Sequence, residues 1–319
     1  MPTIWMHIEY GRRLAEEFRG QLSFLHGLEE NRVLYQLGCQ GPDFLLYHRF
    51  LPWYRKSSAA RLGDLIHRQS CGPVLIEFWQ RTRSLPVYLR GSAQIYFLGF
   101  LTHHLLDRNM HPYINWRAGY KQRHHQRFEV ALDTVFMKEF KGINTWQTDT
   151  SKEIDVGPRL PAHIHDILHQ TAMSWFPEMS IDAENWQGAY KDMLLAHKCL
   201  YDPAGWKKAI IRGPIHKLFY QPLSAEEEEH DYLNLKHTSW HHSALYSEVR
   251  SDSVWDLWDQ ALEEGRLVFH TLADFISAPT ASEASRHLGN LSLVLGNRSY
   301  DTGKNCGSNL VNLYAEPIW

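Results

Sequence analysis

The chain has 319 residues and carries 33 Lys and Arg against 36 Asp and Glu, which gives a formal net charge of −3. Hydrophobic residues make up 44% and charged residues 22% of the sequence, which is typical of a soluble globular protein and excludes a disordered or collagen-like chain. The nearly balanced charge argues against a dedicated nucleic-acid binder, which normally has a basic excess. The 20 histidines stand out, because so many imidazoles indicate metal binding or acid–base chemistry.

The four cysteines are widely separated and form no Cys-x-x-Cys pair (Cys39, Cys71, Cys199 and Cys306). This spacing excludes a zinc ribbon, a redox motif and a dense disulfide framework, so a bound metal is expected to have His and carboxylate ligands. The first residues lack the basic and apolar regions of a secretory leader, and the longest apolar run, 95–101, is too short to cross a bilayer. We therefore expect a cytoplasmic protein without a transmembrane segment.

Helical periodicity dominates the chain from its beginning. Ile4, Ile8, Leu14 and Phe18 are spaced so that they share one face of an amphipathic helix. Similar patterns follow at 59–70, 72–83, 91–109, 121–140, 161–175, 184–201 and 252–277. Strand signals are sparse, because the sequence has no sustained alternation of apolar and polar residues and no Asn-Gly or Asp-Gly turn.

These patterns predict an all-α fold with one compact multi-helix domain over residues 1–319. The polar segments 141–160 and 221–243 are expected to be loops. Within the single domain we expect a catalytic core over 1–245 and a helical extension over 246–319 that packs on it.

The most informative residues are two carboxylates that each follow a histidine by four positions. His103 pairs with Asp107 and His125 with Glu129, so each pair lies on one helical face with Cβ atoms about 5–6 Å apart. His103 ends an apolar run that should be buried, and buried imidazoles and carboxylates need partners such as a divalent cation. His111 adds an imidazole where this helix is expected to end. Nitrogen and oxygen ligands without thiolate suit zinc, and the alternative is chance spacing in a histidine-rich chain.

The segments His103-His-Leu-Leu-Asp107 and His125-Gln-Arg-Phe-Glu129 resemble the paired motifs of the zinc-dependent bacterial phospholipases C. That family is all-α and holds three zinc ions in one cleft. The resemblance extends upstream, because Gly41-Pro42-Asp43-Phe44 is similar to the family's Asp-bearing loop. By motif it covers about residues 1–130.

The resemblance implies a ligand set for two or three zinc ions. One zinc would be held by Asp43, His67, His103 and Asp107, a second by His111, His125 and Glu129, and a third by His7 with Asp107 bridging. In the family, the third zinc also binds the main chain of an N-terminal Trp. Here Trp5 is internal, and the candidate amine is that of Pro2 after removal of Met1.

The implied chemistry is phosphodiester hydrolysis by a metal-bound hydroxide. Clustered zinc ions lower the pKa of a water and stabilise charge on the phosphoryl oxygens. Asp43 is expected to be a general base as well as a ligand, because a carboxylate at the metal edge can accept a proton from water. The implied substrate is a phosphoester or phospholipid, such as a phosphorylcholine-like ester.

Two further groups of residues have alternative interpretations. His165 and His169 could share a helix face as a ligand pair, although an ordinary polar face is the simpler interpretation. Five aromatic residues around Asp43 either line a pocket for a choline-type cation or pack the core (Trp5, Phe44, Tyr47, Trp53 and Tyr54).

Two other functions compete with the phospholipase C interpretation. A single-strand nuclease-like zinc phosphodiesterase is similar in fold and ligand set, and a non-catalytic protein of the same fold could keep the metals without turnover. The nearly neutral charge disfavours the nuclease, so no nucleic-acid partner is expected.

Overall fold

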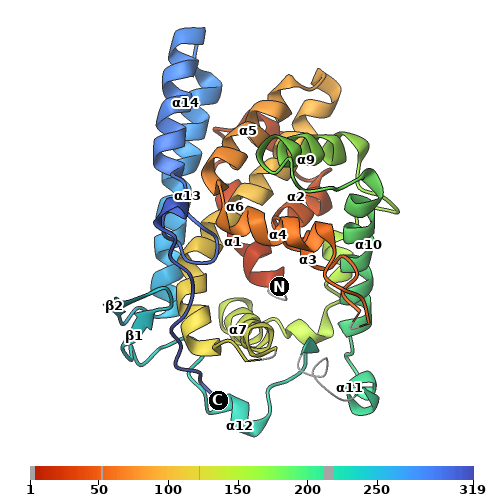
Figure 1. Ribbon diagram of the computed structural model, residues 1–319, viewed down its shortest axis with the longest axis vertical. Coiled ribbons are helices and arrows are strands. Elements are labelled where there is room, and N and C mark those ends of the chain that lie inside the picture. The colour runs from red at the N-terminus through yellow and green to blue at the C-terminus, as the bar shows by residue number, and fades with distance from the viewer. Residues whose placement is uncertain (1–3, 52, 122, 212–217) are drawn as a thin grey trace.

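The computed structural model describes residues 4–51, 53–121, 123–211 and 218–319. It is mostly helical (Figure 1), which confirms the all-α fold class predicted from the sequence. The α-helices are α1 (Ile4–Glu17), α2 (Arg32–Gly38), α3 (Asp43–Leu46), α4 (Ser58–Arg68), α5 (Cys71–Ser84), α6 (Val87–Ala118), α7 (His124–Lys141), α8 (Ser151–Ile154), α9 (Ala162–Trp175), α10 (Ala183–Leu200), α11 (Trp206–Ile210), α12 (Ala225–Glu228), α13 (Val254–Ser277) and α14 (Ala281–Leu295). The 3-10 helices are η1 (Ser23–Gly27), η2 (Thr145–Gln147) and η4 (Cys306–Ser308), and the strands are β1 (Trp240–His242) and β2 (Leu245–Arg250).

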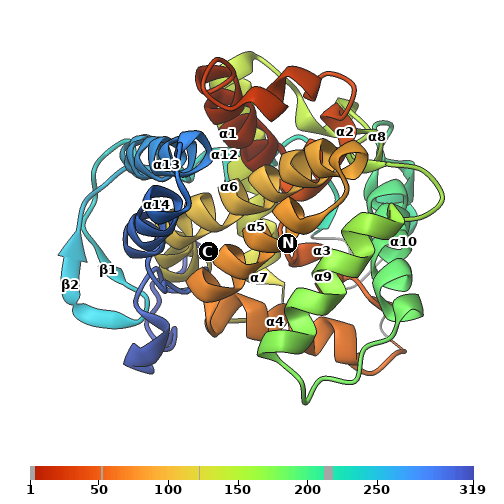
Figure 2. The same cartoon turned by 90° about the horizontal axis from the view of Figure 1, so that it is seen from above.

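Helix α6 is the central element of the molecule (Figure 2). Every residue from Ile95 to Met110 is buried, because α1, α2, α5, α7 and α13 pack around the helix. A helix that is enclosed on all sides contributes to the core along its whole circumference. Polar residues in this stretch therefore point into protein, and their partners must come from other elements.

Helix α6 continues past the point where the sequence predicts its end. The expected range is 91–109, but the helix runs to Ala118 with Pro112 inside it. Proline removes one backbone donor and leaves the carbonyl four residues earlier, that of Arg108, without its helical partner. The backbone of Gly303 fills the space beside that carbonyl, and a Cβ at this position would overlap the Arg108 oxygen. His111 thus lies inside the helix rather than at its end.

Strands β1 and β2 form an antiparallel hairpin in a region that the sequence places partly in a loop and partly in a helical extension. Trp240 pairs with Arg250 across the hairpin, and the Arg250 guanidinium lies 5.2 Å from the centroid of the Trp240 ring. Three residues on one side are too few to produce a recognisable alternation of apolar and polar residues, which is why the pattern does not predict a strand.

The segment after β2 packs on the central helix through α13, which also contacts α1 and α14. Glu264 of α13 accepts hydrogen bonds from Arg108 of α6, at 2.8 Å, and from Arg298, at 2.7 Å. The Arg108 guanidinium is almost fully buried, so these bonds compensate for its desolvation. Glu264 therefore fixes the loop that contains Arg298 against α6, beside the histidines of that helix.

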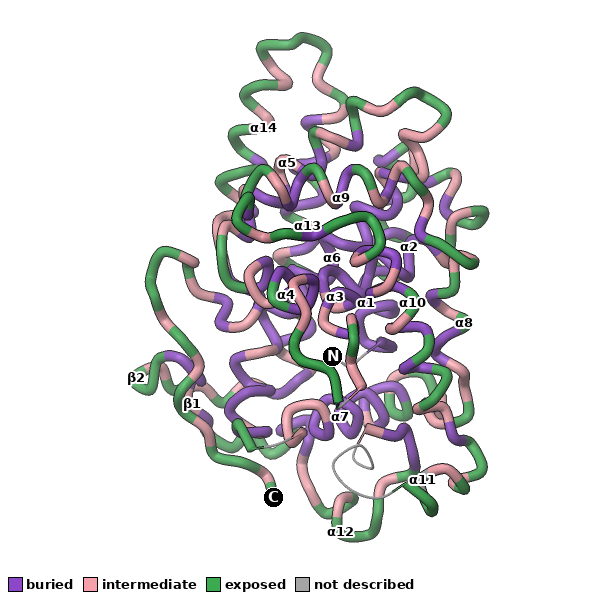
Figure 3. The backbone as a smooth tube through the Cα atoms, turned by 45° about the vertical axis from the view of Figure 1, so that its right-hand side comes forward, coloured by how far each residue is buried: buried purple, intermediate pink, exposed green. Residues whose placement is uncertain are grey.

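Burial is concentrated in the middle of the molecule, while the outer end of α14 and the region of α12 are exposed (Figure 3). The largest fully buried side chains include Trp79, Trp186 and Trp258, so much of the aromatic excess fills the core. None of the described helices combines the length and apolar character that a membrane span requires.

Candidate metal centre

Five helices bring together the eight residues that the sequence predicts as zinc ligands. They come from α1 (His7), α3 (Asp43), α4 (His67), α6 (His103, Asp107 and His111) and α7 (His125 and Glu129), where α3 is a single turn that presents its first residue. Apart from His103, all of them line one cavity of about 1000 Å³. Their ligand atoms form three groups within which every atom lies within 4.8 Å of the others.

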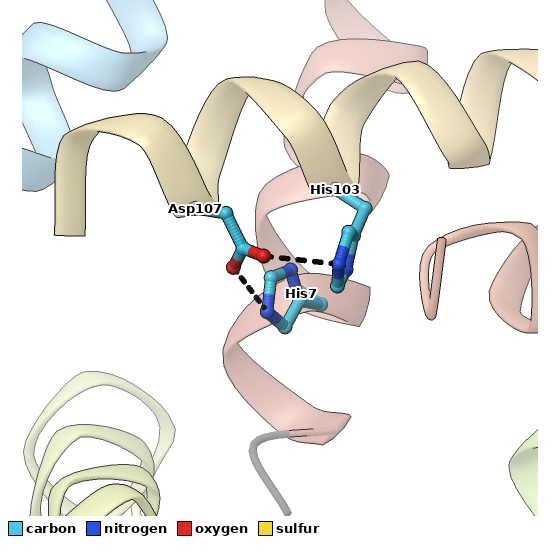
Figure 4. Close-up of side chains that lie close together, drawn as sticks. All are labelled: His7, His103 and Asp107. Carbon is cyan, nitrogen blue, oxygen red and sulfur yellow. Dashed lines mark ion pairs between the residues drawn. The ribbon is translucent and has the colours of Figure 1, made fainter. Parts of the chain in front are cut away.

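The first group joins α1 to α6 and consists of His7, His103 and Asp107 (Figure 4). The two oxygens of Asp107 face different histidines: Oδ1 lies 3.2 Å from His7 Nε2, and Oδ2 lies 3.0 Å from His103 Nε2. The two imidazole rings stack with centroids 4.3 Å apart. A carboxylate whose oxygens diverge in this way has the arrangement needed to bridge two ions.

The second group consists of Asp43, His67 and His103. Asp43 Oδ1 lies 3.1 Å from His67 Nε2. His103 enters this group because Gly41 leaves room for its ring: a Cβ on Gly41, whose φ is +51°, would overlap the imidazole. The loop that carries Asp43 can therefore pass directly against the His103 ring.

The third group consists of His111, His125 and Glu129. Glu129 Oε1 lies 3.2 Å from His125 Nε2 and 3.6 Å from His111 Nε2. His111 is one helical turn beyond Asp107, so α6 presents its three candidate ligands on one face over two turns.

Backbone carbonyls orient three of the imidazoles. The Nδ1–H of His67 donates to Gly63 O (2.6 Å), that of His103 to Cys39 O (3.1 Å) and that of His111 to Tyr300 O (3.0 Å). With Nδ1 as the donor, the Nε2 atom of each neutral ring keeps its lone pair and faces carboxylate oxygens. This second hydrogen bond is the usual way in which proteins orient a histidine that binds a metal through Nε2.

Three buried polar atoms at the centre make no well-oriented hydrogen bond to the described residues. They are His7 Nδ1 and the facing pair His103 Nε2 and Asp107 Oδ2, which lie 3.0 Å apart. Leaving such atoms unsatisfied costs about 1–3 kcal/mol each. A divalent cation satisfies both kinds of atom at once, because imidazole nitrogen and carboxylate oxygen are zinc ligands. The donor set and its unsatisfied atoms therefore fit zinc.

The electrostatics of the centre favour added positive charge. Burial opposes protonation of the imidazoles, but Asp43 raises the pKa of His67 to about 9, and Asp107 and Glu129 raise that of His111 to about 10. Asp107 is itself buried, yet the surrounding histidines hold its pKa well below the usual range. The carboxylates are thus ionised, and cations are stabilised between them.

A family comparison agrees with this geometry. The model of the family described as zinc dependent phospholipase C matches residues 6–198, which is more than half of the chain. The chain belongs to the zinc-dependent phospholipase C family. It is therefore a member of a hydrolase family that depends on zinc, and the matched region contains all eight candidate ligands. No curated protein and no solved structure matches the chain at a significant level.

Asp133 of α7 holds the start of α1 in place. The backbone N–H groups of Trp5 and Met6 donate to the Asp133 carboxylate at 3.1 and 2.9 Å, and Tyr220 donates to it at 2.9 Å. The Trp5 backbone is thus part of the helix start, and Pro2, the candidate amine ligand, lies outside the described residues. Asp133 fixes the position of His7, which lies one residue beyond Met6.

The loop after α14 also supports the candidate ligands, and it lies outside the family match. Tyr300 accepts from His111 through its carbonyl and donates its N–H to His67 O at 3.0 Å, while its ring lies 5.0 Å from that of His67. The sequence alone indicates no role for this loop. The sequence shows a polar turn flanked by Gly296 and Gly303. Such a turn indicates a fixed backbone conformation, but it does not predict which residues the loop contacts.

The remaining histidine and aromatic candidates of the sequence analysis lie elsewhere. His165 pairs with Asp166, and His169 accepts a hydrogen bond from Trp186, so neither belongs to a candidate metal group of the described residues. Of the five aromatic residues near Asp43, only Tyr54 lines the cavity. Trp5, Phe44 and Tyr47 are buried, and Trp53 is exposed outside it.

Proposed function

We propose that this protein is a phosphodiester hydrolase of the phospholipase C type that uses two or three zinc ions to cleave a phospholipid-like ester. The observation that carries the proposal is the convergence of three carboxylate–imidazole groups on one large cavity. A protein that needed zinc only for stability would be expected to enclose the metal in protein ligands, whereas seven of these eight residues line open space.

The proposed ligand sets follow the three groups. Asp43, His67 and His103 would hold one ion, and His111, His125 and Glu129 would hold a second. His7 and Asp107 would hold a third, and Asp107 would also contribute to the first. When bound, clustered zinc ions activate water and neutralise charge on a phosphodiester.

The side chains of the protein then have distinct tasks. Asp43 is partly exposed and lines the cavity, so its carboxylate can accept a proton from the attacking water. Asp107 is 4% exposed, and its two oxygens face the imidazoles of His7 in α1 and His103 in α6. The carbonyls of Gly63, Cys39 and Tyr300 orient three imidazoles so that their Nε2 atoms face the carboxylates of the centre.

The test is zinc-dependent hydrolysis of bis(p-nitrophenyl) phosphate, a small diester that needs no headgroup recognition. We expect turnover that is lost on chelation and restored by zinc, together with cleavage of a phospholipid in detergent micelles. Faster cleavage of single-stranded DNA than of phospholipid would instead favour a nuclease, and zinc binding without any turnover would favour a non-catalytic protein.

A further inference from the structure

The cavity in front of the metal centre is lined by five basic side chains: Arg49, Lys56, Arg68, Lys121 and Arg123. It is also lined by five carboxylates: Asp43, Asp64, Asp107, Glu129 and Asp301. Three of these carboxylates belong to the proposed zinc ligands, so their charge is used within the metal centre. The balance of the remaining charges determines which headgroups the cavity accepts.

Two of the basic side chains are neutralised by the two remaining carboxylates. Lys56 forms an ion pair with Asp64, and Arg68 forms one with Asp301 at 2.6 Å. Among the described lining residues, each carboxylate therefore either belongs to the proposed zinc ligands or is paired with a basic side chain. None is free to bind a positively charged headgroup.

The other three basic side chains have no ion pair with any described residue (Arg49, Lys121 and Arg123). We call these three residues the cationic rim. Arg49 and Lys121 are exposed and Arg123 is partly buried, so they lie where the cavity meets solvent. Unpaired basic side chains around a concave site attract anions and raise their local concentration.

The two arginines of the rim are held in an unusual backbone conformation. The φ angles of Arg49 and Arg123 are +57° and +60°, in the left-handed region that residues other than glycine seldom adopt. The Arg49 N–H donates to Asp192 Oδ2 at 2.8 Å, and the Arg123 carbonyl accepts from Arg127 N at 2.9 Å, so neighbouring helices maintain both conformations. Strain of this kind persists where the surrounding structure enforces it, and it is concentrated at functional sites.

One of the two exposed aromatic rings in the cavity lining already has a cation over it. Tyr54 and Tyr120 are the exposed aromatic residues of the described lining. The Arg49 guanidinium already lies over the Tyr54 ring, 5.9 Å from its centroid. A choline-type cation would have to displace it and would also meet the charge of the rim, so the headgroup pocket considered from the sequence is disfavoured.

We propose that the cationic rim selects phosphodiesters whose headgroup adds negative charge, such as a second phosphate, over diesters with a cationic headgroup. This inference rests on the proposed function, because it names the substrate class of the same cavity. The scissile phosphate occupies the metal centre, and the guanidinium groups of Arg49 and Arg123 donate charge-assisted hydrogen bonds to the second anion. Nucleic acid is the less suitable polyanion, because the chain carries a net charge of −3 and the rim offers only three cations rather than a basic track.

The experiment compares three lipids in neutral-detergent micelles with the zinc-loaded protein: phosphatidylinositol 4-phosphate, phosphatidylglycerol and phosphatidylcholine. Their headgroups are negative, neutral and positive, and we expect kcat/KM to fall in that order, by about tenfold or more overall. The deacylated diesters, glycerophosphoinositol 4-phosphate and glycerophosphocholine, distinguish a soluble substrate from a lipid. The same order for the soluble pair would support selection by the headgroup itself.

The variants Arg49→Gln and Arg123→Gln should each lower kcat/KM for phosphatidylinositol 4-phosphate about fivefold to tenfold, mainly through KM, and reduce its salt dependence. The matched control is Arg55→Gln, which removes the same charge from the neighbouring loop at a residue that does not line the cavity, and it should retain wild-type selectivity. Zinc content and circular dichroism establish that each variant is folded and loaded.

The possible failures are distinguishable. Suppose the protein hydrolyses bis(p-nitrophenyl) phosphate but its kcat/KM for phosphatidylcholine equals or exceeds that for phosphatidylinositol 4-phosphate. This result would overturn the proposed selection by the cationic rim and leave the proposed function standing. Unchanged selectivity in both rim variants would do the same. Preferred cleavage of single-stranded DNA would instead overturn both the proposed function and this inference, in favour of a nuclease. Absence of any zinc-dependent diester hydrolysis would overturn the proposed function and this inference with it.

Discussion

In the proposed function, Asp43 combines zinc binding with proton transfer, because it contacts His67 and lines the cavity. Replacing it by Asn keeps its shape but removes its charge and basicity. We expect Asp43→Asn to lower kcat for bis(p-nitrophenyl) phosphate by about 100-fold or more, which is typical of the loss of a general base. The control Asp64→Asn, a cavity carboxylate paired with Lys56, should remain within about threefold of wild type. Equal activity of the two variants would contradict the assigned role.

Gly41 is a test of whether the close approach to His103 matters. In Gly41→Ala the added methyl group meets both an unfavourable φ and the His103 ring, so we expect a loss of about 2–4 kcal/mol in the free energy of unfolding and reduced zinc content. Gly142 also has a positive φ, of +67°, but no other group lies within 4 Å of the place that a methyl group would take there. Gly142→Ala should cost only about 1 kcal/mol and leave zinc content unchanged. The interpretation fails if denaturant titration gives the two variants the same stability and both bind zinc fully.

At the scale of elements, Asp133 connects α7 to the start of α1 and so to His7. Asp133→Ala leaves two backbone N–H groups and the Tyr220 hydroxyl without their buried acceptor. We expect a loss of about 2–4 kcal/mol and a lower zinc content, measured by urea unfolding and elemental analysis. Asp182→Ala is the control, because Asp182 accepts from Asn185 at the exposed start of α10, far along the chain from the ligands. It should cost about 1 kcal/mol and leave zinc in place. Full zinc content in Asp133→Ala would show that Asp133 is not needed to position the zinc ligands.

The contact between α10 and the end of α3 depends on a neutral histidine. His197 Nε2 lies 3.1 Å from the Tyr47 hydroxyl, and its Nδ1 lies 3.0 Å from that of Thr150. Burial lowers the pKa of His197 to about 4 from 6.5, so the folded state binds this proton less readily than the unfolded chain. Its contribution to stability is complete above about pH 6.5 and is lost as the pH falls toward 4.

For the metal-free protein, this linkage amounts to about 2 kcal/mol between pH 7.5 and pH 5. We therefore expect the free energy of unfolding of His197→Gln to fall by about 2 kcal/mol less than that of wild type over the same interval. Chemical denaturation at the two pH values measures the difference. Parallel pH dependences of the two proteins would show that His197 is not the group responsible.

At the scale of the whole molecule, local patterns predicted most of the long helices and the residues that converge on the cavity. The signal was strong where it was local: His103 and Asp107, like His125 and Glu129, are neighbours on one helical face, which spacing alone reveals. His7, Asp43 and His67 come from separate elements, and the resemblance to the family was needed to join them to the pairs. The structure brings all eight together in three groups.

The features that sequence reasoning missed depend on contacts between distant segments. Tyr300 supports His67 and His111 from about 200 residues away, and no periodicity links them. Helix α6 continues through Pro112, and Gly303 of the same loop lies beside the Arg108 carbonyl, which the proline leaves without its helical partner. The cationic rim could not be predicted from the sequence either. Only the ion pairs in the folded structure show which basic side chains of the cavity are neutralised by a carboxylate.

The zinc content of the purified protein tests the central claim most directly. Elemental analysis of protein prepared without added metal should give two or three zinc ions per chain, with about one fewer in Glu129→Gln, whose carboxylate belongs only to the group with His111 and His125. Hydrolysis of bis(p-nitrophenyl) phosphate should rise and fall with zinc content on chelation and reconstitution. Protein that contains no stoichiometric metal yet hydrolyses the diester, or that cannot bind zinc on reconstitution, would contradict the account.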